Sequence, residues 1–124
     1  MQNDEVAVDV LRLVSTGDVQ AVRTHLTTDA SMELPFAPSG VESTFKGTDA
    51  IIGALEYVAK HFRAFSFNAH EIYVSAGGDT VILEATSMAV RHSGGCYQNR
   101  YVFVFTFRNN KILRWREFFN PDFI

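Results

Sequence analysis

The chain has 124 residues, of which 47% are apolar and 20% charged, values typical of one folded globular domain rather than of a disordered chain. Its net charge of −3 and the lack of a basic run argue against a nucleic-acid partner. No apolar run approaches the length of a membrane span, and the N-terminal residues lack a signal-peptide pattern. We therefore expect a cytoplasmic protein without a membrane partner.

The N-terminal half of the sequence predicts three helices and one strand. Apolar residues recur at helical spacing in three segments, and Gly17, Asp18 and Thr48 supply a stop signal and two caps. Pro35, Pro38 and Gly40 mark a loop. The predicted elements are a helix over residues 6–14, a short helix over 18–26, a turn at 27–29, a strand over 31–36 and a helix over 48–62.

The C-terminal half has a different pattern, in which long runs of β-branched and aromatic residues are separated by turn sequences. Four strands joined by tight turns predict an antiparallel meander. Because helices precede the strands, the fold class is α+β, with the helices against one face of the sheet. No linker divides residues 1–124, so we expect a single domain. The predicted strands are residues 65–74, 80–90, 97–107 and 111–119.

The loop between the last two strands determines which residues share a face of the sheet. A two-residue loop, Asn109-Asn110, would place arginines opposite phenylalanines. A three-residue loop over 108–110 with a bulge keeps one face apolar, so the hydrophobic pattern favours it. The predicted cross-strand pairs are then Phe105 with Leu113, Phe103 with Trp115 and Tyr101 with Glu117. The inner face would comprise Tyr97, Asn99, Tyr101, Phe103, Phe105, Leu113, Trp115, Glu117 and Phe119.

The opposite face of these two strands mixes apolar and cationic residues. Val102, Val104 and Ile112 lie there together with Arg114 and Arg116 in the predicted register. Such a face is too apolar for free solvation and resembles a protein–protein surface. We expect a homodimer through this face; cover by the chain's own termini is the alternative.

Glu117 is the leading candidate for a functional side chain. A carboxylate on an apolar face is costly to bury, and desolvation shifts its pKa upward, toward the range of a general acid or base. Tyr101 and Asn99 are within cross-strand reach as hydrogen-bond partners. A structural carboxylate bonded to Tyr101 or to a helix end is the alternative.

Other polar residues give weaker indications. Glu84 lies in a predicted strand, where a surface salt bridge is expected. His61 ends the third helix and could border a pocket, although a histidine at a helix C-terminus is also favourable electrostatically. The four histidines and Cys96 lack metal-ligand spacing, and no nucleotide or nucleophile motif is present. We therefore expect neither a metal nor a cofactor.

Several segments together resemble a known family. The segments DAS-M-E-L-P, FKGTDAI and KILRWREFFNP are similar to the nuclear transport factor 2-like superfamily, in particular its SnoaL-like branch of polyketide cyclases and phenazine-biosynthesis condensing proteins. Residues 97–99 (YQN) and 116–120 (REFFN) resemble the phenazine proteins' Y-x-N and R-E-F-x-N segments, whose glutamate is a pocket acid/base. The resemblance gives that role to Glu117.

The resemblance also implies a cone-like α+β barrel, in which a curved antiparallel sheet is wrapped by three N-terminal helices, and a dimer. The sequence differs from that of ketosteroid isomerase, a member of the same superfamily. Leu34, Val10 and Phe103 stand where that enzyme has its base and its oxyanion-hole groups. Fold alone does not determine the reaction.

The sequence thus leaves three functions open. The first is a cofactor-independent cyclase, isomerase or condensing enzyme acting on a small apolar carbonyl compound, with Glu117 as the general acid/base. The second is a pocket that binds a small apolar or aromatic metabolite without turnover, and the third is a dimerisation module. In the first two, the ligand would be lined by Tyr97, Asn99, Tyr101, Phe103, Trp115, Phe119 and His61.

Overall fold

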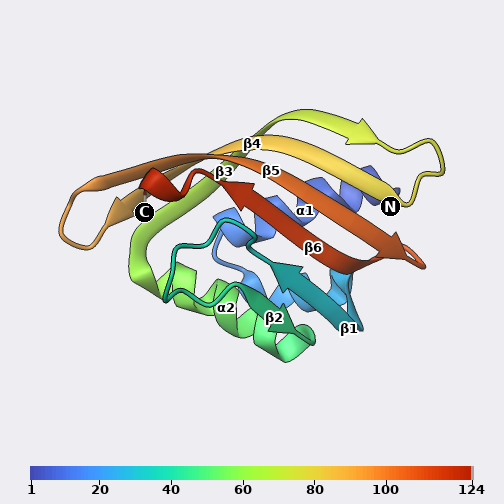
Figure 1. Ribbon diagram of the computed structural model, residues 1–124, viewed down its shortest axis with the longest axis horizontal. Coiled ribbons are helices and arrows are strands. Elements are labelled where there is room, and N and C mark those ends of the chain that lie inside the picture. Colours follow the sequence, from blue (N-terminus) through green and yellow to red (C-terminus); the bar gives the residue numbers. More distant parts are fainter. Residues whose placement is uncertain (124) are drawn as a thin grey trace.

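A computed structural model describes residues 1–123, in which helices cover one face of a curved, six-stranded sheet (Figure 1). The N-terminal part consists of α1 (Asn3–Ser15), the 3-10 helix η1 (Val19–His25), β1 (Leu26–Glu33), β2 (Thr44–Lys46) and α2 (Thr48–His61). The strands β3 (Phe62–Val74), β4 (Thr80–Arg91), β5 (Cys96–Arg108) and β6 (Lys111–Phe119) follow, and η2 (Pro121–Phe123) is a short 3-10 helix. The α+β class and the four-stranded meander are confirmed.

The strand order β2-β1-β6-β5-β4-β3 corrects the prediction of a purely antiparallel sheet. β1 pairs in parallel with β6, so the sheet is mixed. β2 and β3 form its two edges, so the sheet is curved and open, and the cone-like barrel that the resemblance implied is not confirmed (Figure 1). The three-residue strand β2 was not predicted, because it is too short to show alternation and forms by pairing with β1.

Two element boundaries differ from the predicted ones for tertiary reasons. Residues 27–29 were predicted as a turn but belong to β1, which begins at Leu26, opposite Ile112 of β6. Phe62 was predicted to end the last helical stripe. It is the first residue of β3, with φ −115° and ψ 149°, because it pairs with Arg91 of β4. Pairing across the sheet therefore overrides local helical spacing at both positions.

The predicted register of the β5–β6 hairpin is wrong. Asn109 and Asn110 have φ values of 52° and 65°, which is the geometry of a two-residue turn with both central residues in the left-handed region. A bulge at Leu113 follows, between the pairs Thr106–Arg114 and Phe107–Ile112. The bulge restores an apolar inner face and exchanges the expected positions of two residues: Ile112 is buried, and Leu113 is only partly so.

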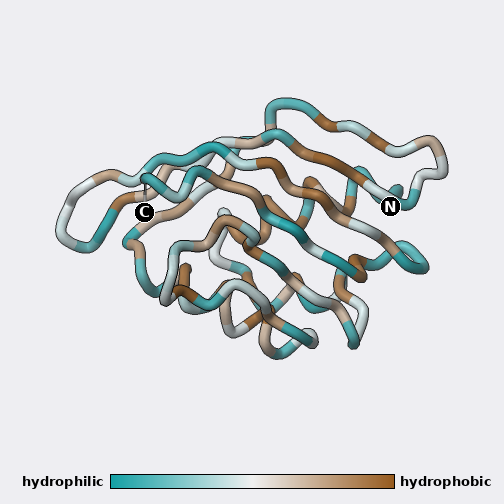
Figure 2. The backbone as a smooth tube through the Cα atoms, in the orientation of Figure 1, coloured by the Kyte–Doolittle hydropathy of each residue, from teal (hydrophilic) through white to brown (hydrophobic). Residues whose placement is uncertain are grey.

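The resulting pairs are Phe105 with Trp115, Phe103 with Glu117 and Tyr101 with Phe119. The rest of the predicted inner face is unchanged. The three-residue loop would shift the register by one residue, and the bulge shifts it by one residue in the opposite direction, so both arrangements leave the same side chains on the inner face. The inner face packs against α1, η1 and α2 in one core. Figure 2 shows this as brown, apolar stretches in the central strands and helices. Among residues 1–123, no helix has both the length and the apolar character that a bilayer crossing requires.

Candidate functional site

The inner face of β5 and β6 carries a continuous group of aromatic side chains. Phe103 and Trp115 are fully buried, and Tyr101 and Phe119 nearly so. The Phe103 ring stacks on Tyr101 with centroids 5.5 Å apart and meets Trp115 edge-on at 6.4 Å. Phe67 of β3 packs edge-on against Tyr101 at 5.1 Å. Both arrangements are favourable for aromatic quadrupoles, so four of the predicted site residues form one rigid apolar wall.

Glu117 is the acidic side chain of this wall. It lies opposite Phe103, and its carboxylate accepts a hydrogen bond from Trp115 Nε1 at 3.2 Å. The residue retains partial solvent access. Burial nevertheless outweighs the tryptophan hydrogen bond and raises the pKa of Glu117 to about 7. Near neutral pH both the acid and the carboxylate are then populated, which is the condition for accepting a proton and returning it.

The Tyr101 hydroxyl is a second polar group beside this wall. It lies 3.0 Å from Ser87 Oγ, which also accepts a hydrogen bond from the backbone N–H of Asn99 at 3.1 Å. Burial is the main cause that raises the pKa of Tyr101, and the nearby Tyr97 hydroxyl and the Glu117 charge raise it further. The phenol therefore remains protonated and serves as a neutral hydrogen-bond donor. The predicted direct partner of Glu117, Tyr101, sits one pair away from it, since Tyr101 pairs with Phe119.

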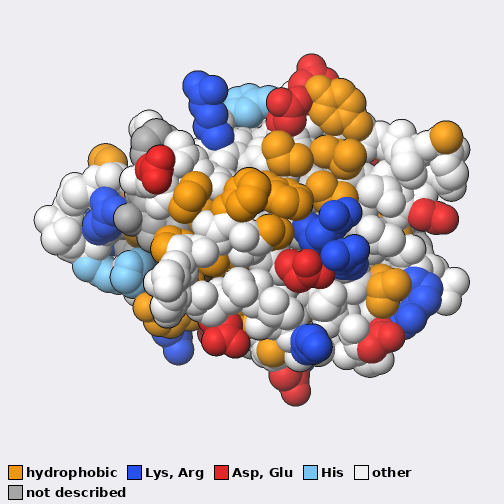
Figure 3. Space-filling view, in the orientation of Figure 1, with side chains coloured by type: hydrophobic (Ala, Val, Ile, Leu, Met, Phe, Trp, Pro, Cys, Tyr) orange, Lys and Arg blue, Asp and Glu red, His pale blue; other side chains and the backbone are white. Residues whose placement is uncertain are grey.

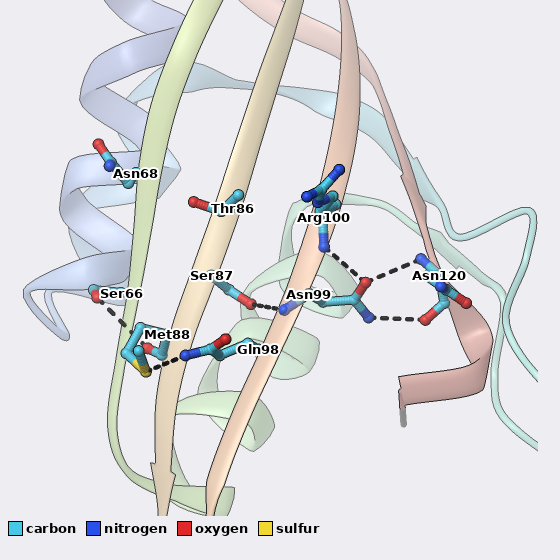
Figure 4. A pocket seen from close by; sticks show the side chains of 9 residues that line it. All are labelled: Ser66, Asn68, Thr86, Ser87, Met88, Gln98, Asn99, Arg100 and Asn120. Atoms are coloured by element: carbon cyan, nitrogen blue, oxygen red, sulfur yellow. Dashed lines mark hydrogen bonds between the residues drawn. The ribbon is translucent and has the colours of Figure 1, made fainter.

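Asn99 is buried and connects the start of β5 to the residue after β6. Its Nδ2 donates to the Tyr97 hydroxyl at 2.7 Å and to the Asn120 carbonyl at 2.9 Å (Figure 4 draws the Asn120 bond). Its Oδ1 accepts from the backbone N–H of Asn120 at 3.1 Å and from that of Arg100 at 2.8 Å. The amide is thus fully used by the protein, an arrangement that positions Tyr97 and the end of β6.

His61 and Tyr97 lie where the aromatic wall approaches the surface. His61, the exposed last residue of α2, stacks on Tyr57 at 5.7 Å and meets Phe62 edge-on at 5.0 Å. Phe62 in turn stacks on Tyr97 at 5.6 Å. Burial decreases in this direction, from fully buried Phe103 to partly exposed Tyr97 along β5. The structure therefore places His61 at one end of an aromatic row. The rings of Phe62 and Tyr97 separate it from the part of the wall that carries Glu117.

Three contributors to this region were not found from the sequence. Ser87 was missed because both faces of β4 are apolar enough to point inward, so alternation did not decide its orientation. Phe62 was assigned to the helical stripe. Phe67 was assigned to a strand whose inward face was not determined. The indole hydrogen bond to Glu117 was not predicted either, although Trp115 and Glu117 share one face of β6 in both registers. Ser87 lies between Ala85 and Ala89 on the buried face of β4. This alternation of small residues is the signal that could have identified Ser87.

Two hollows lie on the other face of the sheet, away from Glu117. One, of about 710 Å³, is shown in Figure 4, with the helices behind the strands; it is lined by Ser66, Asn68, Thr86, Ser87, Met88, Gln98, Asn99, Arg100 and Asn120. The second, of about 660 Å³, lies beside it and is bounded by Phe36, Val102 and Phe118 among others. Glu117 lines neither hollow. Inner-face residues of the same strands also border them, Ser87 and Asn99 in the first hollow and Tyr101 and Phe119 in the second.

Glu84 borders the second hollow, and its expected salt bridge is not formed among residues 1–123. Its carboxylate instead accepts a hydrogen bond from the Tyr73 hydroxyl at 2.6 Å, and Glu71 is its cross-strand neighbour. Within the described residues, no three His, Cys, Asp or Glu side chains gather closely enough to hold a metal ion.

Comparison with known proteins agrees with the resemblance seen in the sequence. Residues 7–115 match the SnoaL-like domain. The chain is 30% identical over 122 residues to the PhzA/B-like protein PA3332 of Pseudomonas aeruginosa, covering 98% of this chain and 86% of that protein. It is 33% identical over 94 residues to YesE of Bacillus subtilis, covering 75% of this chain and 64% of YesE. Both relatives are themselves uncharacterised.

Solved structures share the fold over nearly the whole chain. A Bacillus subtilis protein described as a candidate isomerase superposes with a TM-score of 0.86 at 28% identity, covering 100% of this chain and 93% of that one. The phenazine-biosynthesis protein PhzB2 of Pseudomonas aeruginosa has a TM-score of 0.84 at 18% identity, with 98% and 76% of the chains covered. A SnoaL-like polyketide cyclase candidate from Jannaschia has a TM-score of 0.81 at 16% identity, with 96% and 85% covered. At such identities these last two show the fold alone. The match over residues 7–115 shows that the chain belongs to the SnoaL-like domain family.

Proposed function

We propose that the protein binds a small apolar or aromatic carbonyl compound against the wall of Tyr101, Phe103, Trp115 and Phe119, and that Glu117 transfers a proton within it. The observation that carries this proposal is a partly accessible carboxyl group on an aromatic face, with a pKa of about 7. Enzymes of cyclase and isomerase type require an acid/base poised in this way.

The proposed step needs only the protein's own groups. The Glu117 carboxylate removes a proton from the carbon next to the carbonyl, and the electron pair of the broken C–H bond moves to the carbonyl oxygen as an enolate. The neutral Tyr101 hydroxyl is the nearby donor available to that oxygen. In a ligand with a conjugated double bond, return of the proton at the far carbon gives isomerisation. Attack of the enolate on a second carbonyl within the ligand gives ring closure, and the alkoxide that forms there takes the proton from Glu117. No redox group or metal ion enters this chemistry.

The experiment is hydrogen–deuterium exchange at carbon. Cyclic and aryl ketones are incubated with the protein in D₂O, and loss of the α-proton signal is followed by NMR. We expect the wild type to accelerate exchange and Glu117→Gln to abolish the acceleration. Glu84→Gln is the matched control, because it removes a carboxylate from the outer face and leaves the aromatic wall intact.

The same ligands report on binding independently of turnover. Trp115 is the one tryptophan of the sequence, so its emission monitors the wall directly. Ligands that shift this emission and raise the melting temperature without exchanging protons would support a binding protein and contradict the enzyme proposal. No response in either measurement would contradict the pocket itself.

We further propose that the outer face of the sheet forms a homodimer. Figure 3 shows an apolar patch across this face with cationic and acidic side chains beside it. Phe36 and Val102 are exposed there, and Arg116 Nε is enclosed without a hydrogen-bond partner among residues 1–123. Glu84 on the same face has no cationic partner among those residues, so a second copy can supply complementary charges.

A further inference from the structure

Basic side chains gather at the end of the molecule where the aromatic row reaches the surface. We name this group the basic rim; it comprises Lys60 and His61 at the end of α2, Arg63 in β3, Arg91 at the end of β4, and His92. Residues 57–70 and 85–116 contain no Asp or Glu, although the whole chain has a net charge of −3. Figure 3 shows Lys, Arg and His side chains at this end, where Figure 1 places the β4–β5 hairpin. The chain segments 57–70 and 85–116 therefore supply cations to this end without a carboxylate of their own.

The rim is not neutralised by ion pairs. Among residues 1–123 the ion pairs involve Arg12, Arg23, His25, Arg108 and Arg114, and none involves a member of the rim. Glu56 lies one turn before Lys60 in α2, and its carboxylate accepts a hydrogen bond from Gln20 Nε2 at 2.7 Å. Unpaired cations of this kind produce a local positive potential that attracts anions.

Hydrogen bonds and ring contacts attach the rim to the aromatic wall. The His92 ring Nε2 donates to the Lys60 carbonyl at 2.8 Å, which joins the β4–β5 hairpin to the end of α2. Arg91 donates to the Cys96 carbonyl at 2.9 Å, and its guanidinium lies 5.7 Å from the centre of the Tyr97 ring. Tyr97 stacks on Phe62, which contacts His61. The Arg91 guanidinium is thus held beside the end of the aromatic row, and the Lys60 backbone is held beside the β4–β5 hairpin.

We infer that the ligand of this protein carries a carboxylate or a similar negative charge on its apolar or aromatic body. This inference rests on the proposed function. The body packs against the aromatic row where it reaches the surface, at the partly exposed rings of Phe62 and Tyr97, while the charge stays next to Lys60, Arg63 and Arg91. A neutral ligand of the same shape gains the ring contacts alone. Exposed ion pairs contribute modestly, so we expect a charge preference of about five- to twentyfold for the whole rim.

A pair of probes with the same rings tests the inference. The affinities of 2-naphthoate and of its neutral amide, 2-naphthamide, are measured by calorimetry at low and at high salt. We expect the carboxylate to bind at least about fivefold more tightly at low salt, and the difference to shrink as salt screens the rim. Equal affinities, or a preference that does not depend on salt, would overturn the inference while leaving the proposed function standing.

Charge-removing variants locate the effect. The double variant Lys60→Gln/Arg63→Gln should lower the affinity for 2-naphthoate toward that of 2-naphthamide and leave 2-naphthamide binding unchanged. The control, Lys46→Gln/Lys111→Gln, removes the same charge from β2 and from the start of β6 and should change neither affinity. A double variant that weakens both probes alike contradicts the rim as a charge-selective element. If neither probe binds the wild type, the aromatic pocket of the proposed function fails, and this inference fails with it.

Discussion

Glu117 makes the stability of the fold depend on pH. Its unfolded pKa is near the ordinary value of 4.5, and burial raises the folded value to about 7. The folded state therefore binds the proton more tightly than the unfolded state. Stability from this residue is fully present below pH 4.5 and is lost as pH rises to about 7, where the loss levels off.

Glu117→Gln should remove this pH dependence. The amide cannot ionise, and its oxygen can still accept from Trp115 Nε1, so the variant should be more stable than the wild type by up to about 3 kcal/mol at pH 8. At pH 4 the two proteins should differ little. Melting temperatures or urea unfolding curves from pH 4 to 8 measure the difference.

The control for that series is Glu84→Gln on the outer face, which should show no comparable trend. A structural carboxylate paired with a cation behaves oppositely, because its loss destabilises most near neutral pH. A Glu117→Gln protein that becomes progressively less stable than the wild type as pH rises would therefore exclude the catalytic assignment.

At the residue scale, the sequence predicted the candidate acid and its aromatic surroundings but not its hydrogen bonds. Alternation along the last strand is enough to place Glu117 with Trp115 and Phe119, because the side-chain period of two survives any register. The cross-strand neighbour of Glu117 depends on the register itself, which was predicted to place Tyr101 there and in fact places Phe103. A bulge is a local choice between two nearly equal backbone paths, and nothing in the alternation around Leu113 distinguishes them.

At the level of elements, Asn99 joins strands that are not adjacent in sequence. Its amide bonds both backbone groups of Asn120, so it fixes the end of β6 against the start of β5. Without it, the segment after Phe119 has one fewer attachment, and Tyr97 loses a donor. The aromatic row from Tyr97 to Phe62 depends on this fixation.

Asn99→Ala should destabilise the protein by about 2–4 kcal/mol, because several buried polar groups lose their partners at once. Amide exchange of Asn120 should accelerate more than that of the β3–β4 ladder. Asn68→Ala, an exposed asparagine in the outer hollow, is the matched control and should change stability little. Equal effects of the two substitutions would show that Asn99 does not hold the end of β6.

Most elements could be predicted from the sequence, and the exceptions have one physical cause. Helical spacing identified α1 and α2, and β-branched and aromatic runs identified β3 to β6. The early start of β1 and the existence of β2 arise from pairing with strands elsewhere in the chain. Such pairings are decided by the whole sheet and leave little trace in a window of a few residues.

At the scale of the whole molecule, the proposed dimer would form through the outer face. The exposed apolar patch around Val102 and Phe36 is unfavourable in water, and the unpartnered Arg116 Nε adds to that cost. A twofold arrangement covers both with the same surface from a second copy.

Val102→Asp should therefore weaken the dimer before it affects the fold. Val8→Asp on α1 is a matched control, because the two valines are similarly exposed, at 39% and 38%. We expect sedimentation or light scattering to show a shift toward monomer for Val102→Asp only, with unchanged circular dichroism. A wild type that stays monomeric from micromolar to millimolar concentration would contradict the proposed dimer.

The parallel pair of β1 and β6 also affects the order in which the chain folds. Strands β3 to β6 are joined by tight turns and can pair locally, whereas β1 must wait for a strand that begins about 80 residues later. Closing so long a loop is slow, so the meander should form first and β1 should join it late. During synthesis β6 is the last strand to emerge. The N-terminal segment therefore lacks its neighbour in the sheet until translation is almost complete, and a chain that stops before Lys111 leaves the inner edges of both β1 and β5 without a partner.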